Sequence, residues 1–214
     1  DVFGDALGDG LKFATTNGAV IESGTEYSAI GARGVRIGFN SPNFAEQTAG
    51  FAATGGLDFS RIKNGTAEIR FLMYVPEGLD ISKLSLGAVQ NYNSSLAGKT
   101  VRLKAAVALD RYVKNTGWNL VRIPLKDLPQ KGVYTATSAN LPYETNFNYS
   151  NVEELVLVSE LQGLAENTYF MVDEIAIYAN QAPEVVSVKA GGSVLENNAV
   201  ISGQTNQFSV KFDT

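Results

Sequence analysis

The amino-acid sequence predicts an all-β protein of the β-sandwich jelly-roll class. Short apolar or β-branched runs recur along the chain, and residues that favour turns separate them. Within several runs the apolar residues alternate with polar ones, as in a strand with one buried face. The chain holds 21 glycines and no convincing amphipathic helix. Many short strands joined by turns are typical of a sandwich or jelly roll.

The clearest alternation lies in residues 67–75, where Ile69, Phe71 and Met73 share one face. We expect residues 126–128 to form a short helical turn. Residues 129–151 are polar, aromatic and irregular, which predicts a long loop. The expected strands are residues 13–16, 20–23, 35–39, 67–75, 84–89, 101–109, 118–125, 152–161, 168–178, 184–189 and 207–212.

A linker, Gln181-Ala182-Pro183, is expected to divide the chain. The segments Pro183–Val188 and Phe208–Phe212 resemble the opening of bacterial Ig-like repeats. About 30 residues are too few for a sandwich of their own. We therefore expect a domain at residues 1–180, followed at 181–214 by the linker and the first strands of a truncated Ig-like module. The alternative is that residues 182–214 pair with the main sheet.

The composition excludes several classes of function. A formal net charge of −5 argues against nucleic acid or an anionic membrane as partner. No apolar run is long enough to cross a bilayer, so we expect no membrane insertion. Histidine and cysteine are both absent, which excludes the common nucleophilic triads, ordinary zinc sites and disulfides. Carboxylate chemistry, Lys or Tyr acid–base chemistry and hard-cation binding remain.

Three segments, taken in order, resemble jelly-roll carbohydrate-binding modules of families 11, 4, 22 and 30. The first is the acidic and aromatic opening at residues 1–5. The second, residues 117–128, is similar to the pattern Trp-x-x-φ-x-φ-Pro-φ-x-x-φ, where φ is apolar. The third, residues 169–178, is similar to the closing pattern φ-x-φ-Asp-x-φ-x-φ. The resemblance implies a non-catalytic module that binds a polysaccharide or oligosaccharide.

Asp173 is a candidate calcium ligand. We expect it to share one face of the closing strand with Met171, Ile175 and Ile177. A carboxylate in line with core side chains needs a cation, an arginine or a set of backbone donors. The resemblance implies a structural calcium ion beside the first strand, with Asp5 as the second ligand and nearby carbonyl oxygens completing the shell. The alternative is that loop amides or a salt bridge satisfy Asp173.

Aromatic and polar side chains in or beside loops are the candidate sugar contacts. Aromatic rings stack on pyranose rings, and polar groups bind the hydroxyls. On the middle strands, the face opposite the core should carry Ser85, Gly87 and Arg102 beside other polar residues, which predicts a shallow trough. For the aromatic residues, a packing role is the alternative. The candidate ligand-binding residues are Gln90, Tyr92, Lys104, Tyr112, Trp118, Tyr143 and Glu160.

We expect no catalytic activity. A glycoside hydrolase needs two carboxylates about 5 to 10 Å apart across the sugar. Glu153 and Glu154 are neighbours that should face opposite ways on a strand. The expected setting is a secreted or extracellular protein with other modules in the same polypeptide, and attachment to the cell surface is one form of it. The alternatives are a purely structural spacer or adhesion module and, after it, a glycoside hydrolase or lyase on a jelly roll.

Overall fold

A computed structural model describes residues 1–39, 46–94, 98–135, 142–160, 168–179, 185–190, 193–195 and 208–212. It divides into two compact units, Asp1–Ala179 and Asn180–Thr214. The first unit is an all-β sandwich, which confirms the predicted fold class. No helix in the described ranges is long and apolar enough to cross a membrane.

The first unit consists of strands and single turns of 3₁₀ helix. The 3₁₀ turns are η1 (Thr25–Tyr27), η2 (Ile81–Lys83), η3 (Leu109–Arg111) and η4 (Leu125–Asp127). The strands are β1 (Leu11–Thr15), β2 (Ala19–Gly24), β3 (Gly34–Phe39), β4 (Glu46–Leu57), β5 (Glu68–Val75), β6 (Leu84–Ser94), β7 (Lys99–Ala108), β8 (Gly117–Pro124), β9 (Lys131–Thr135), β10 (Pro142–Asn146), β11 (Val152–Glu160) and β12 (Thr168–Tyr178).

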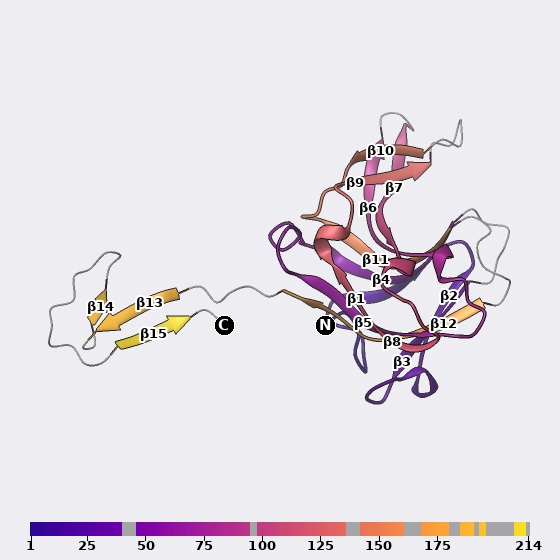
Figure 1. The fold of residues 1–214 in the computed structure, drawn as a ribbon. Coiled ribbons are helices and arrows are strands. Elements are labelled where there is room, and N and C mark those ends of the chain that lie inside the picture. Colours follow the sequence, from indigo (N-terminus) through magenta and orange to yellow (C-terminus); the bar gives the residue numbers. More distant parts are fainter. Residues whose placement is uncertain are drawn as a thin grey trace. The chain divides into compact units, whose positions relative to one another are not determined.

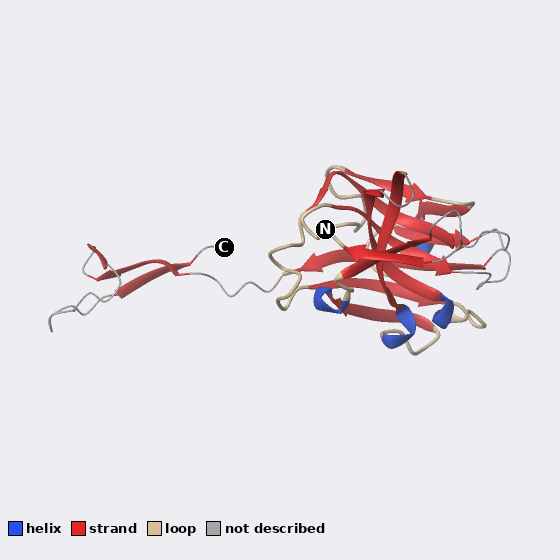
Figure 2. Cartoon of the chain, turned by 90° about the horizontal axis from the view of Figure 1, so that it is seen from above, coloured by secondary structure: helices blue, strands red, loops and turns tan. Residues whose placement is uncertain are grey.

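These strands form two antiparallel sheets that face one another (Figures 1 and 2). The large sheet has seven strands in the order β1-β4-β11-β6-β7-β9-β10. The small sheet has five strands in the order β2-β3-β12-β5-β8. In Figure 1 the large sheet lies above the small one, and β9 and β10 continue it beyond the small sheet.

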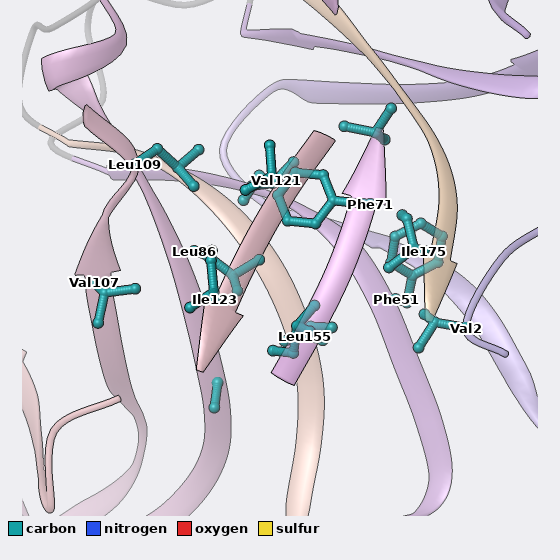
Figure 3. Close-up of a cluster of buried hydrophobic side chains, with 14 of the residues drawn as sticks. Val2, Phe51, Phe71, Leu86, Val107, Leu109, Val121, Ile123, Leu155 and Ile175 are labelled. Carbon is teal, nitrogen blue, oxygen red and sulfur yellow. The ribbon is translucent and has the colours of Figure 1, made fainter. Parts of the chain in front are cut away.

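The core fills the space between the sheets. Ile69, Phe71 and Met73 of β5 are all buried, as their alternation predicts. They pack with side chains from the facing sheet, among them Leu86 of β6 and Leu155 of β11 (Figure 3). Removing so much apolar surface from water is the main force that holds the layers together.

Two parts of the large sheet differ from the sequence-based expectation. Residues 129–151 were expected to be a loop, but they contain the hairpin of β9 and β10. Strand β4 was not expected at all, because its alanines and glycines have low strand propensity. Its neighbours require these small residues: a Cβ atom on Gly50 would lie 2.2 Å from the Leu155 carbonyl oxygen.

The closing strand β12 contains a bulge that changes its faces. Its register against β5 shifts between Asp173 and Ala176, and Glu174 has a φ of 51°. The expectation that Met171 shares the core face with Ile175 is therefore wrong. Met171 pairs with Tyr74 on the outer face, while Asp173 is still fully buried. A bulge resets the alternation of a strand, and period-two reasoning does not detect it.

The opening segment pairs with this same strand. Val2 N and Phe3 N both donate to Ile175 O, at 2.8 and 2.9 Å. Ile175 N donates to Phe3 O at 2.6 Å. The first and third segments of the resemblance are therefore neighbours in space.

The second unit contains β13 (Val185–Ala190), β14 (Ser193–Leu195) and β15 (Phe208–Phe212). They form an antiparallel sheet in the order β14-β13-β15, so its described strands pair with one another. An Ig-like identity for this unit stays a prediction.

Candidate functional site

A row of small residues crosses the outer face of the large sheet. Ala106, Gly87, Val156, Gly50 and Ala14 occupy one register position on β7, β6, β11, β4 and β1. Four of the five are glycine or alanine, and we call the band of sheet that this row crosses the trough. Its position agrees with the expected face.

Valine side chains and two long cations shape one end of the trough. Val89, Val156 and Val158 point away from the core and yet form a buried cluster of their own. The side chain of Lys104 on β7 lies over Gly87: a Cβ atom added to Gly87 would lie 3.3 Å from the lysine Cγ. Such a stem covers apolar surface while its charged end reaches a polar partner.

Both cations pair with acidic residues on other strands. Lys104 Nζ lies 2.6 Å from Glu46 Oε2 on β4. Arg102 Nη2 lies 2.5 Å from Glu154 Oε2 on β11, and Arg102 Nη1 donates to Thr48 Oγ1 at 3.3 Å. These pairs balance the charge over the valine cluster and close that end of the trough.

An open groove runs along the other end, over β1, β4 and β11. We call it the β1–β4–β11 groove. Small residues form its floor, and amide, carboxylate and ammonium groups form its rim. Phe13 is the only aromatic residue among its described lining, and its ring packs into the core against Phe51 at 5.8 Å between centroids. The lining residues that matter below are Lys12, Ala52, Thr54, Asn151, Glu153 and Glu154.

Glu153 and Glu154 both line this groove, which corrects the expectation that they face opposite ways. The pairing of β11 with β4 shifts register between Val152 and Glu154, so alternation fails there as it does in β12. Glu153 Oε2 accepts from Asn91 Nδ2 at 2.5 Å, and Glu154 pairs with Arg102. Each carboxylate is therefore held by a donor from the same sheet.

The predicted ligand-binding residues do not gather at one place. Lys104 lies on the trough, whereas Gln90 is buried and its Oε1 accepts from Asn148 N at 3.0 Å. Trp118 lies on the outer face of the small sheet, where its ring meets Tyr74 edge-on. Glu160 is the last residue of β11, and its side chain lies outside the described residues.

Two of the three predicted tyrosines lie at the far end of the large sheet. Tyr92 and Tyr143 flank Tyr134, with centroid separations of 6.4 and 5.1 Å. Tyr112 lies elsewhere, and its hydroxyl donates to Asp127 Oδ2 at 2.8 Å. Burial, with this carboxylate beside it, raises the pKa of Tyr112 to about 12. Two predicted residues are thus brought together by Tyr134, which sequence reasoning missed.

The candidate calcium ligand Asp173 is surrounded by hydrogen-bond donors. Its Oδ2 accepts from Ala29 N at 2.7 Å and Ile30 N at 3.0 Å. Its Oδ1 accepts from Glu174 N at 2.9 Å. These amides satisfy the buried charge, which is the alternative that the sequence left open.

Asp5 is held by the same loop. Its Oδ1 accepts from Ala32 N at 2.5 Å and from Arg33 N at 2.9 Å. Both hydrogen bonds lower the pKa of Asp5, and the bond from Arg33 has the larger effect. Gly31, with a φ of 75°, allows the close approach. N–H groups cannot ligate a cation, and no cluster of three or more acidic residues occurs in the described ranges. The described donors around Asp5 and Asp173 do not fit a calcium site. The calcium ion that the resemblance implies remains a prediction.

One buried cation lies apart from these sites. Lys63 is buried, and among the described residues its Nζ has no hydrogen-bond partner. It lies 4.9 Å from the centroid of the Tyr149 ring. Burial lowers the pKa of Lys63 because it disfavours the charged form.

Comparison with known proteins finds solved structures with a similar fold but no matching sequence family. No family model matches the chain, and no curated protein matches it. Solved structures are similar. One is the family 30 carbohydrate-binding module of the cellulosomal cellulase Cel9D-Cel44B of Clostridium thermocellum, with 18% identity, 80% of this chain and 87% of that chain covered, and a TM-score of 0.53. Another, titled a family 30 carbohydrate-binding module, has 18% identity, coverage of 82% and 80%, and a TM-score of 0.55.

At this identity the likeness establishes the fold alone. It confirms the β-sandwich over the first unit. Lys12 was not singled out from the sequence, and Glu153 was considered there only as part of a catalytic pair. No local signal marks them, because three strands far apart in the chain must meet before the groove exists.

Proposed function

We propose that this chain is a non-catalytic carbohydrate-binding module that holds a single glycan chain in the β1–β4–β11 groove. The observation that carries the proposal is the groove itself. A floor of small residues gives a polymer room to lie against the sheet, and amide, carboxylate and ammonium groups on the rim match sugar hydroxyls. The shared fold with family 30 modules supports this role.

The lining predicts how the sugar is held. Because the described lining presents no exposed aromatic ring, hydrogen bonds from the rim must supply most of the affinity. Glu153, already oriented by Asn91, is the central acceptor, and Lys12 is a donor on β1. A secreted, multi-modular setting and a cell-surface location remain part of the proposal.

Binding is tested by affinity electrophoresis and calorimetry against soluble glucans, xylans, mannans and galactans. Ala52→Trp should fill the groove and Glu153→Ala should remove the acceptor, each weakening binding about tenfold or more, which corresponds to 1.4 kcal/mol. Glu144→Ala is the matched control, because this exposed glutamate lies on β10 outside the groove. Equal affinity in all three variants would exclude the groove.

The structural-spacer alternative predicts that no glycan binds at all, and that result would refute the proposed function. A reducing-end assay with the same glycans tests the hydrolase alternative, since two carboxylates line the groove. We expect no turnover, because Glu154 is paired with Arg102 and Glu153 with Asn91.

A further inference from the structure

Among the described strands, β8 is the outermost strand at one edge of the small sheet, and this edge is apolar. Strand β8 pairs with β5 along its whole length, from Gly117 opposite Val75 to Pro124 opposite Glu68. It is the last strand in the sheet order. Its outward side chains include Leu120, 62% exposed, and Trp118, 39% exposed. Edge strands in native proteins are usually short, bulged or lined with charge, because a long regular edge is a template for another strand.

The neighbouring strand β5 contributes further apolar side chains beside this edge. Trp118 packs edge-on against Tyr74 at 5.6 Å between centroids, and Leu120 lies opposite Leu72. The apolar surface is therefore a ribbon two strands deep, and within the described part of the chain the backbone of β8 pairs on one side only. Both arginines at its border, Arg70 and Arg122, bond to Glu68.

Among the described residues of this face, two arginines lie over aromatic rings, whereas Arg122 pairs with Glu68 and Trp118 packs only against Tyr74. Arg36 lies over Tyr169 at 4.9 Å, and Arg70 lies over Tyr178 at 4.2 Å. Arg122 and Trp118 point to the same side of β8 but lie four residues apart, which is about 13 Å along a strand. They cannot meet within one copy.

We propose that two copies of this chain associate through β8, with the strands antiparallel and Leu120 at the two-fold axis. In that register Leu120 lies opposite Leu120 of the second copy, and Trp118 lies opposite Arg122. Directly opposed residues of an antiparallel pair share one face, so each guanidinium reaches the partner's indole ring. The edge is self-complementary, as an isologous two-fold interface requires. The proposal is independent of glycan binding.

Cysteine trapping tests the register, because the chain has no cysteine of its own. Leu120→Cys should form a disulfide-linked dimer rapidly on mild oxidation, since opposed strand positions bring two Cβ atoms within disulfide range. Tyr169→Cys is the matched control: this residue is 43% exposed on the same face but lies on interior strand β12. Equal rates of trapping for both variants would overturn the proposal.

Sedimentation of the unmodified chain over a wide concentration range gives a second measurement. We expect a monomer–dimer equilibrium whose dissociation constant rises about tenfold or more in Leu120→Asp, while melting of the monomer is unchanged. A monomer at every concentration would overturn the proposal. Glycan binding that is lost in Trp118→Ala, with a monomeric chain, would also overturn it and assign this face to a sugar.

Discussion

Replacing the buried carboxylate Asp173 by asparagine tests how the loop at residues 28–33 is held. The carboxylate accepts three short amide hydrogen bonds, from Ala29, Ile30 and Glu174. Asparagine keeps the shape but removes the charge, and it turns one acceptor into a donor. The change therefore isolates the hydrogen-bond pattern from packing.

The structure allows the magnitude to be worked out. If the amide oxygen keeps Ala29 and Ile30, each bond weakens by about 1 kcal/mol on losing its charged acceptor. The new NH₂ group then faces the Glu174 amide, and a buried donor without an acceptor costs about 2 kcal/mol. The sum is about 4 kcal/mol, which lowers the melting temperature by about 12 °C in a domain of this size.

The assay is thermal and urea-induced unfolding followed by circular dichroism. Asp5→Asn is the control, because this exposed residue binds the same loop from outside, and its effect should be clearly smaller. A loss below about 1 kcal/mol in Asp173→Asn would refute the reasoning, since it is less than one buried unsatisfied donor costs.

The same melts test the calcium prediction. If loop amides alone satisfy Asp173, neither a chelator nor added calcium should change the melting temperature of the unmodified chain. A lower melting temperature with the chelator that calcium restores would confirm calcium and reassign the stabilisation to the ion.

Three further substitutions test individual packing arguments. Lys63→Met should stabilise the fold by about 1 to 2 kcal/mol at neutral pH, because it removes a buried cation that has no hydrogen-bond partner among the described residues. Burial lowers the pKa of Lys63 in the folded chain. The gain in stability should therefore shrink as the pH rises from this lowered pKa towards about 10.4, the pKa of lysine in the unfolded chain. Urea-induced unfolding at two pH values measures the difference. Gly50→Ala should destabilise by about 2 to 3 kcal/mol, because its Cβ would lie 2.2 Å from Leu155 O; unchanged stability would contradict the register of β4. Gln90→Leu should cost about 1 to 2 kcal/mol by leaving Asn148 N unpaired but leave glycan affinity unchanged; weaker binding with equal stability would make Gln90 a ligand contact.

The fold class was predictable because alternation is a local property. In β5 buried and half-buried residues alternate one by one, in the order that the sequence predicts. Prediction failed where the backbone leaves the regular strand. The bulge at Asp173 moved Met171 outward, and the register shift at Val152 brought Glu153 and Glu154 into one groove.

The candidate site was predictable only in part, for a related reason. The small and polar residues of the trough, such as Gly87 and Lys104, could be placed on the outer face by counting along two strands. Which aromatic residues share a surface depends on strand order. Tyr92 and Tyr143 meet through Tyr134, whereas Trp118 lies on the other sheet.

By itself, the sequence determined that this chain is an all-β protein with a buried aspartate in its closing strand and no histidine or cysteine chemistry. Periodicity, turn residues and composition are properties of residues close together in the sequence, so they can be recognised without knowing which strands pair. The tertiary structure alone decided that loop amides bond to Asp173, that the groove forms over β1, β4 and β11, and that β8 ends the small sheet. Each of these depends on contacts between residues far apart in the chain, and one shifted register changes which side chains meet.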